Sequence, residues 1–163
     1  MTELDKRIPQ LFALVTEALA GATEALLGGE TRVGRAVVDA DHKIDEITSE
    51  LERAVWEEID ASPVSGAPLR HLVGLLLILP ELERSADLAE HIAQRAVNNL
   101  GASMSPTSRG IVQQMSDVAL QMWSVAADSF TEGISRAEEL VLADDEIDAA
   151  IEEAREHIRS RKD

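Results

Sequence analysis

Two acidic pairs with identical spacing are the part of this sequence most suited to chemistry. Asp41 and Asp45 stand in the pattern D-x-x-I-D, and Asp144 and Asp148 repeat that pattern 103 residues later, since 144 − 41 = 103. A spacing of four residues places both carboxylates of a pair on one face of a helix, one turn apart. Such like charges repel each other, so a pair does not serve helix stability, but it can share a hard cation.

The first aspartate of each pair lies on an apolar helix stripe. A carboxylate on a core-facing stripe is costly unless it is paired or coordinated to a metal. The alternative interpretation is that each aspartate sits near a helix start, where the helix dipole stabilises it. Because the same stripe position is occupied twice, we predict metal ligands. The stripes comprise Val37, Asp41, Ile44, Thr48, Leu51 and Val55, and Leu140, Asp144, Ile147, Ile151, Ala154 and Ile158.

A third acidic face is formed by Glu83, Asp87 and Glu90. In an antiparallel bundle the helix that carries it neighbours the helix with the first acidic pair, so four carboxylates could line one cation site. On a solvated surface, Glu83 and Asp87 would instead pair with nearby arginines. The predicted metal ligands are Asp41, Asp45, Glu83 and Asp87 for a first site, and Asp144 and Asp148 for a partial second site.

Composition limits the classes of fold and partner. Hydrophobic residues make up 45% of the 163 residues and aromatic residues only 2%, which favours packed helices over a β-sandwich. The chain has no cysteine, so a metal site would use oxygen ligands, with histidine as a minor possibility. A net charge of −16 disfavours binding to nucleic acid and to anionic membranes.

The beginning of the sequence and its apolar runs predict a cytoplasmic protein. Residues 1–5 are polar and acidic, without the apolar region of a signal peptide behind them. The longest apolar run, residues 72–79, is too short to span a bilayer. We therefore expect no membrane insertion.

Five helical stretches should position the acidic residues. Apolar periodicity predicts helices over residues 4–27, 30–59, 68–100, 105–132 and 134–163, separated by breaks rich in glycine, proline and serine.

The offset of 103 residues extends beyond the acidic pairs. It also relates Ile8 to Ile111 and Val15 to Val118, which indicates an internal repeat. The predicted fold is all-α, with an antiparallel three-helix bundle over residues 1–102 and a two-helix hairpin of a second, incomplete bundle over residues 103–163. The hairpin would leave apolar stripes exposed, so we expect a homodimer through its two helices.

The acidic motifs together resemble the PhoU family. Members carry an acidic E/D-x-x-x-D motif in the second helix of each of two three-helix bundles, and a segment like L-E-R-I-G-D-H-A in the third. Residues 82–89 read L-E-R-S-A-D-L-A, so Ser85 and Ala86 replace Ile and Gly, and Leu88 replaces His. The chain resembles a member shortened at the C-terminus, since Glu83 and Asp87 shifted by 103 residues would fall beyond Asp163.

The resemblance implies a regulatory function. PhoU proteins bind metal ions (iron, zinc, manganese or magnesium) on these carboxylates and are not thought to be enzymes. They link the phosphate ABC transporter, through its ATPase PstB, to the sensor histidine kinase PhoR, and they act as negative regulators of the phosphate-starvation response. We therefore expect a metal-binding adaptor in phosphate homeostasis.

The residues leave two alternative functions open. The first is a metal-free helical adaptor or chaperone-like regulator of another transporter. The second is a carboxylate-bridged di-metal oxidase, which needs Glu-x-x-His on two helices. No histidine of this chain has a glutamate three residues before it, so no catalytic residue is predicted. The residues three positions before His42, His71, His91 and His157 are Asp39, Pro68, Leu88 and Ala154.

Overall fold

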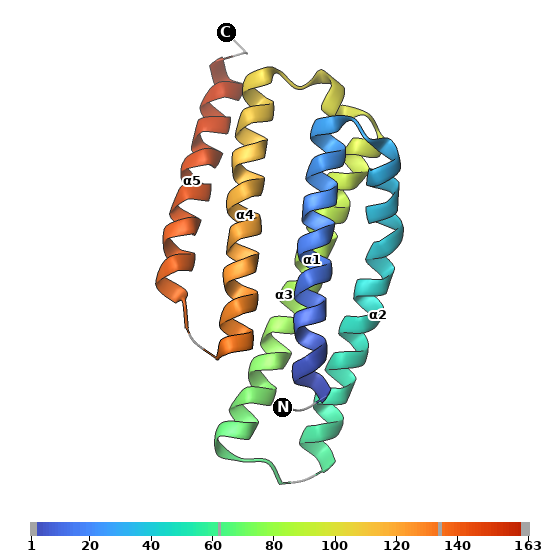
Figure 1. Ribbon diagram of the computed structural model, residues 1–163, viewed down its shortest axis with the longest axis vertical. Coiled ribbons are helices and arrows are strands. Elements are labelled where there is room, and N and C mark those ends of the chain that lie inside the picture. The colour runs from blue at the N-terminus through green and yellow to red at the C-terminus, as the bar shows by residue number, and fades with distance from the viewer. Residues whose placement is uncertain (1–2, 62, 134, 161–163) are drawn as a thin grey trace.

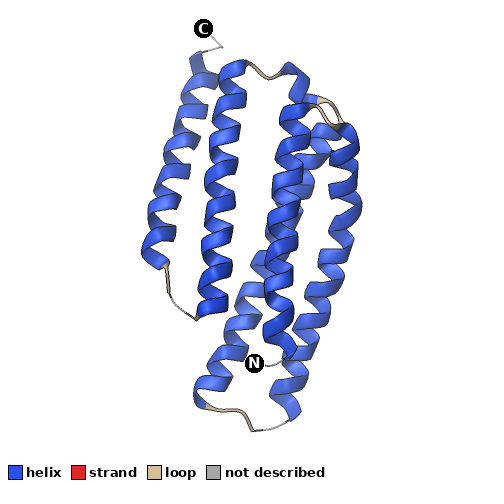
Figure 2. Ribbon diagram, viewed as in Figure 1, coloured by secondary structure: helices blue, strands red, loops and turns tan. Residues whose placement is uncertain are grey.

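The computed structural model describes residues 3–61, 63–133 and 135–160, and these ranges form helices and short loops without a strand (Figures 1 and 2). The predicted all-α class is confirmed. The last helix begins at Ala137 rather than at the predicted position 134, which lies outside the described residues, as do residues 161–163. The elements are α1 (Glu3–Gly28), α2 (Thr31–Ala61), α3 (Gly66–Val97), the 3₁₀ turn η1 (Leu100–Ser103), α4 (Pro106–Glu132) and α5 (Ala137–Ser160).

Helix ends follow from local chemistry. Ser105 caps the start of α4, because its side-chain oxygen accepts a hydrogen bond from the backbone N–H of Ser108, and Pro106 occupies the first turn. Gly133 ends α4 with a φ of 66°, and Gly29 follows α1 with a φ of 72°. Glycine adopts this left-handed conformation without the steric cost that a side chain would add.

Helices α1, α2 and α3 pack around a common apolar core, as the helix stripes predict. The fully buried side chains are mostly aliphatic, and each contributes on the order of 1.5–3 kcal/mol through removal from water. This core is the scaffold that holds the acidic residues of α2 and α3 beside each other. Its members include Ile8, Leu11, Phe12 and Val15 from α1, Ile44, Leu51 and Val55 from α2, and Leu75, Leu79, Leu82 and Ala86 from α3.

Small residues bring α2 and α3 close together. A Cβ atom added to Gly34 of α2 would lie 3.1 Å from the carbonyl oxygen of Ala93 in α3, so even a methyl group would require the two helices to move slightly apart. Ala86, Ala89 and Ala93 are buried along the facing stripe of α3. This close approach brings side chains on the edges of the seam within reach of each other.

Helix α4 packs against α1, and α5 packs against α4 but, within the described ranges, against no other helix (Figure 1). The hydroxyl groups of Thr23 and Ser116 form a buried hydrogen bond of 3.1 Å between α1 and α4. His157 Nε2 lies 3.3 Å from Ser105 Oγ and joins the end of α5 to the start of α4.

The division into repeats of residues 1–102 and 103–163 stays a prediction, and so does the homodimer.

The apolar character of α1 is explained by its place in the core. The segment Lys6–Gly28 is long and apolar enough, by length and composition, to cross a membrane. Its residues Ile8, Leu11 and Val15 are, however, fully buried against α2 and α3. A core helix passes the same test of length and composition, so the segment does not indicate a membrane protein.

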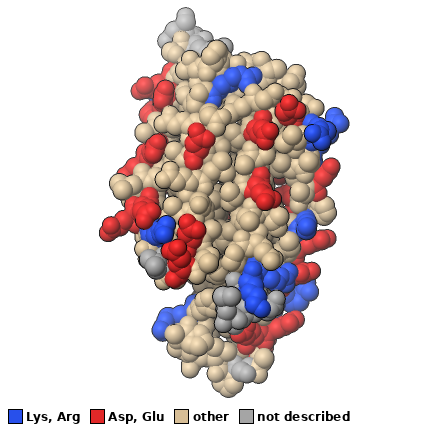
Figure 3. Space-filling view, viewed as in Figure 1, with Lys and Arg blue, Asp and Glu red and all other residues tan. Residues whose placement is uncertain are grey.

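Acidic side chains dominate the surface, as expected from 31 Asp and Glu against 15 Lys and Arg. Figure 3 shows them along both flanks of one face, over α5 on one side and over α2 on the other. Between these flanks, uncharged atoms cover most of the face, interrupted by several acidic side chains and, lower down, by basic ones.

Candidate metal centre

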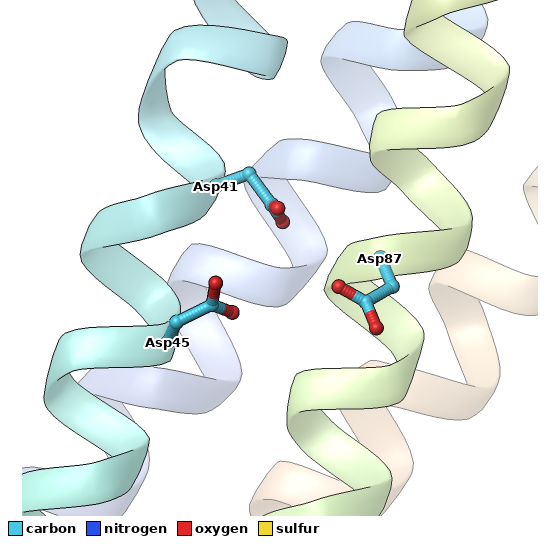
Figure 4. A group of neighbouring side chains, drawn as sticks. All are labelled: Asp41, Asp45 and Asp87. Carbon is cyan, nitrogen blue, oxygen red and sulfur yellow. The ribbon is translucent and has the colours of Figure 1, made fainter.

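Three carboxylates meet between α2 and α3. Asp41 and Asp45 extend from successive turns of α2, and Asp87 extends toward them from α3 (Figure 4). One oxygen from each residue lies within 4.8 Å of the others. Three carboxylate oxygens at such separations can converge on a single cation with a small adjustment of their side-chain rotamers.

The apolar stripes fix the position of each aspartate. Ile44 is buried in the core, which leaves Asp41 and Asp45 half-buried on the edge of α2 that faces α3. In α3, Ala86 is buried, so the next residue, Asp87, projects from the exposed edge of the same seam. The cluster therefore lies at the border between core and solvent, where an ion could enter.

The cluster is electrostatically unfavourable when it holds only its own charges. The pKa of Asp41 is raised above its ordinary value of 3.8, mainly by burial and then by the carboxylates of Asp45, Asp87 and Glu90; His91 opposes the shift. A raised pKa means that the fold disfavours the charged form of this carboxyl group.

Glu83 extends the acidic surface by one turn of α3. Burial first, and then the charges of Asp45, Asp87 and Glu52, raise the pKa of Glu83 above its ordinary value of 4.5. Glu83 is half-buried and lies outside the group of three that shares the distance of 4.8 Å. It stands where a fourth carboxylate could approach a cation held by the other three.

Two buried oxygens of the cluster lack hydrogen-bond partners. Oδ1 of Asp41 and Oδ1 of Asp45 are inaccessible to solvent and accept no hydrogen bond. Oγ1 of Thr48, one turn further along α2, is also buried without a partner. Buried polar atoms are normally satisfied, and an unpaired carboxylate oxygen is the most costly kind. A bound cation would satisfy both carboxylates, so the residues fit a metal.

The donor atoms restrict the kind of metal. Carboxylate oxygens suit Mg²⁺, Ca²⁺ and Mn²⁺, and they also accept ferric iron. The imidazole of His91 lowers the pKa of Asp41, and its Nε2 lies 3.8 Å from a carboxylate oxygen of Glu90. This oxygen-rich surrounding favours hard cations over soft ones.

The second acidic pair is placed differently. Asp144 and Asp148 are both exposed on α5. Among the described residues, no group of three metal-ligating side chains includes either of them. A partial second metal site on this pair stays a prediction.

The structure adds two neighbours to the cluster that the acidic motifs do not include. Thr48 places a buried hydroxyl on the same helix stripe as Asp41, and the charge of Glu52 raises the pKa of Glu83. Both stand seven residues after an aspartate of the first pair, a spacing that keeps residues on one helix face. This spacing is the feature of the sequence that could have indicated both residues as neighbours of the site.

The fold and the cluster define the class: an all-α helical bundle with carboxylates gathered between its second and third helices. Residues 8–96, more than half of the chain, match the PhoU domain. The chain belongs to the PhoU family.

Curated relatives agree over most of the chain. The chain is 29% identical to a phosphate-specific transport system accessory protein PhoU homolog of Aquifex aeolicus, over 91% of this chain and 67% of the relative. Homologs of the same name in Caulobacter vibrioides (27% identical, 91% and 65% covered) and Thermotoga maritima (25% identical, 98% and 67% covered) are also similar. The chain thus spans about two thirds of the length of these relatives. No solved structure matches it.

Proposed function

We propose that this protein is a cytoplasmic, non-catalytic regulatory adaptor of phosphate uptake and phosphate-starvation signalling. Family membership carries the proposal, because the relatives are named as accessory proteins of phosphate-specific transport systems. The proposed partners are the ATPase subunit PstB of a phosphate ABC transporter and the sensor histidine kinase PhoR. The strongly acidic surface suits basic surfaces on such proteins.

The proposed site binds one or more hard cations through Asp41, Asp45 and Asp87, with Glu83 at its edge. The observation that supports it is the pair of buried carboxylate oxygens without partners in Asp41 and Asp45. A cation there would offset the mutual repulsion of the carboxylates and tie α2 to α3. Iron, zinc, manganese and magnesium are the candidates, and the oxygen ligands favour the harder ions among them.

Metal analysis of the purified protein, never exposed to chelator, tests the site. We expect stoichiometric metal in the natural sequence and its loss in an Asp41→Asn/Asp45→Asn variant that stays folded by circular dichroism. Asp145→Asn/Glu146→Gln is the matched control, since it removes two exposed carboxylates from α5. An Asp144→Asn/Asp148→Asn variant reports on the predicted second site through stoichiometry alone.

If neither form holds metal after incubation with each candidate ion, the protein is a metal-free adaptor. The partner proposal has a separate test, which is binding of the natural protein to purified PstB and to the cytoplasmic part of PhoR from the same organism. Binding to neither would overturn the adaptor function, whatever the metal content.

A further inference from the structure

An apolar groove runs along the side of α4 that neither α1 nor α5 covers. One part of the groove has a volume of about 350 Å³, and its walls come from α1, α3, α4 and α5. A second part of about 390 Å³ continues it toward the start of α5, and Ala119 and Ile147 line both parts. The lining includes Leu19 and Leu26 of α1, Ile92 of α3, Met115 and Met122 of α4, and Leu140 of α5.

In the repeat that the offset predicts, the groove corresponds to the place that α3 occupies in the first unit. The offset of 103 residues relates the groove residues Met115 and Ile147 to Phe12 and Ile44. Phe12 and Ile44 pack in the core with residues of α3. By the same offset, Leu140 corresponds to Val37, which packs against Ala89 and Ala93 of α3. The surface is therefore shaped for one amphipathic helix.

The rim of the groove on α5 is acidic. Ile147 lines the groove, and Ala150 is buried against α4. With 3.6 residues per turn, Ala150 lies about 60° to one side of Ile147, while Asp144 and Asp148 lie about 60° and 100° to the other side. Both carboxylates therefore border the open groove, and within the part of the chain that the structure describes no hydrogen bond or ion pair engages either of them.

The opposite rim, on α3, is apolar and basic. Leu88 is 55% exposed, and it lies one turn before the groove residue Ile92 on the outward side of α3. Arg95 is exposed on the same side, and its guanidinium donates to the carbonyl oxygen of His91 rather than to a carboxylate. The two rims differ in charge, so they select both the composition and the orientation of a docked helix.

We propose that this groove binds an amphipathic helix of a partner protein, with basic residues along the flank that faces Asp144 and Asp148. Its apolar stripe would cover Met115, Met122 and Ile147. A second copy of this chain, the occupant that the sequence led us to expect, fits the charges less well, because pairing of two α5 helices would bring four carboxylates of the two acidic rims together. The proposed docking surface is distinct from the carboxylate cluster between α2 and α3.

Two synthetic helical peptides test the proposal. They share one apolar stripe and differ in carrying Lys or Glu along the same flank. Trp123 lines the groove, so its fluorescence in a Trp56→Phe background reports binding to the full chain. We expect the Lys peptide to bind more tightly, and Asp144→Asn/Asp148→Asn to weaken its binding by roughly five-fold at low salt, the effect of two exposed ion pairs.

Matched variants separate the groove from general charge effects. Asp145→Asn removes a carboxylate that points away from the groove, and it should leave peptide binding unchanged. Ala119→Phe and Met122→Lys should each abolish binding while the helical circular dichroism is retained. Equal binding of the two peptides, or of neither, would overturn the proposal. So would light scattering that shows a dimer which Ala119→Phe converts to a monomer, because a second copy would then be the occupant.

Discussion

Phe12 and Trp123, which are 111 residues apart in the sequence (123 − 12 = 111), meet edge to face between α1 and α4. Their ring centroids lie 5.8 Å apart at an interplanar angle of 64°. Phe12 also contacts Phe130, at a centroid distance of 6.0 Å. Such aromatic pairs contribute about 0.5–1.5 kcal/mol beyond the area they bury. One side chain of α1 thus belongs both to the core of the three-helix bundle and to the contact with α4.

Substitution of Phe12 by alanine should therefore destabilise the whole protein. Phe12 is 1% exposed, and removal of a buried phenylalanine side chain lowers the free energy of unfolding by about 3–5 kcal/mol. Urea denaturation followed by circular dichroism measures the loss. Trp56→Ala is the control, because Trp56 is 51% exposed and its removal should cost less than about 1 kcal/mol. A small effect of Phe12→Ala would mean that α4 is not held through this contact.

The metal-free protein should lose stability as the pH rises from about 4 through the raised pKa values of Asp41 and Glu83. The pKa values of Asp41 and Glu83 are raised above 3.8 and 4.5 in the fold. The folded state then binds protons more tightly than the unfolded state, so these groups lower the free energy of unfolding as the pH rises through their raised pKa values. Below the ordinary values both states are protonated and the penalty vanishes.

Thermal unfolding in the presence of a chelator, at about pH 3.5 and about pH 7, measures this dependence. An Asp41→Asn/Glu83→Gln variant should show a smaller drop in melting temperature between the two values than the natural protein. A saturating metal should also reduce the drop, because it neutralises the same carboxylates. An identical drop in the variant would contradict the assignment to these two groups.

The buried hydroxyl of Thr48 should be dispensable for stability. Thr48 is 2% exposed and its Oγ1 lacks a partner, so Thr48→Val exchanges an unsatisfied polar atom for a methyl group of similar size. We expect the free energy of unfolding of the metal-free protein to increase by about 1 kcal/mol. Thr48→Ser, which keeps the hydroxyl and removes the methyl group, should decrease it by a similar amount. Destabilisation by Thr48→Val would show that the hydroxyl has a bound partner.

Two glycines near the start of α4 should respond in opposite ways to alanine. A Cβ atom on Gly101 would overlap the carbonyl oxygen of Leu26, so Gly101→Ala should lower the free energy of unfolding by about 1–3 kcal/mol. Gly110 is exposed within α4 and has open space around it, so Gly110→Ala should increase stability by up to about 1 kcal/mol. Chemical denaturation of both variants checks the pair. Equal effects would mean that the turn after α3 adjusts to the added methyl group.

The contacts around Gly101 also fix the orientation of α4 relative to α1. The guanidinium of Arg109 donates hydrogen bonds to the carbonyl oxygens of Leu27 and Gly101. It thereby joins the first turn of α4 to the end of α1 and to η1. Neither a hydrophobic period nor a turn motif in the sequence indicated this role, because it depends on backbone groups whose positions arise only in the fold.

Periodicity in the sequence was sufficient to predict the helices and the inward faces of α1, α2 and α3. Ile44 and Leu82, for example, are buried where their stripes place them. The convergence of Asp41 and Asp45 with the acidic face of α3 could also be anticipated, because consecutive antiparallel helices pack as neighbours. Asp87, rather than Glu83, completes the closest group of carboxylates. This outcome depends on how far α3 is shifted along its axis relative to α2, and the contact between Gly34 and the alanines of α3 helps to set that shift.

The sequence by itself determined an all-α chain with two equivalent acidic pairs, because helix period and residue type are local properties. Tertiary structure decided that the two pairs differ. Asp41 and Asp45 face a third helix and have buried oxygens, whereas Asp144 and Asp148 border an open groove. It also decided that Trp123 and Phe130 of α4 turn toward Phe12 of α1. The apolar stripe of a helix specifies which of its residues are buried, but the shape and spacing of the neighbouring helices specify which side chains those residues contact.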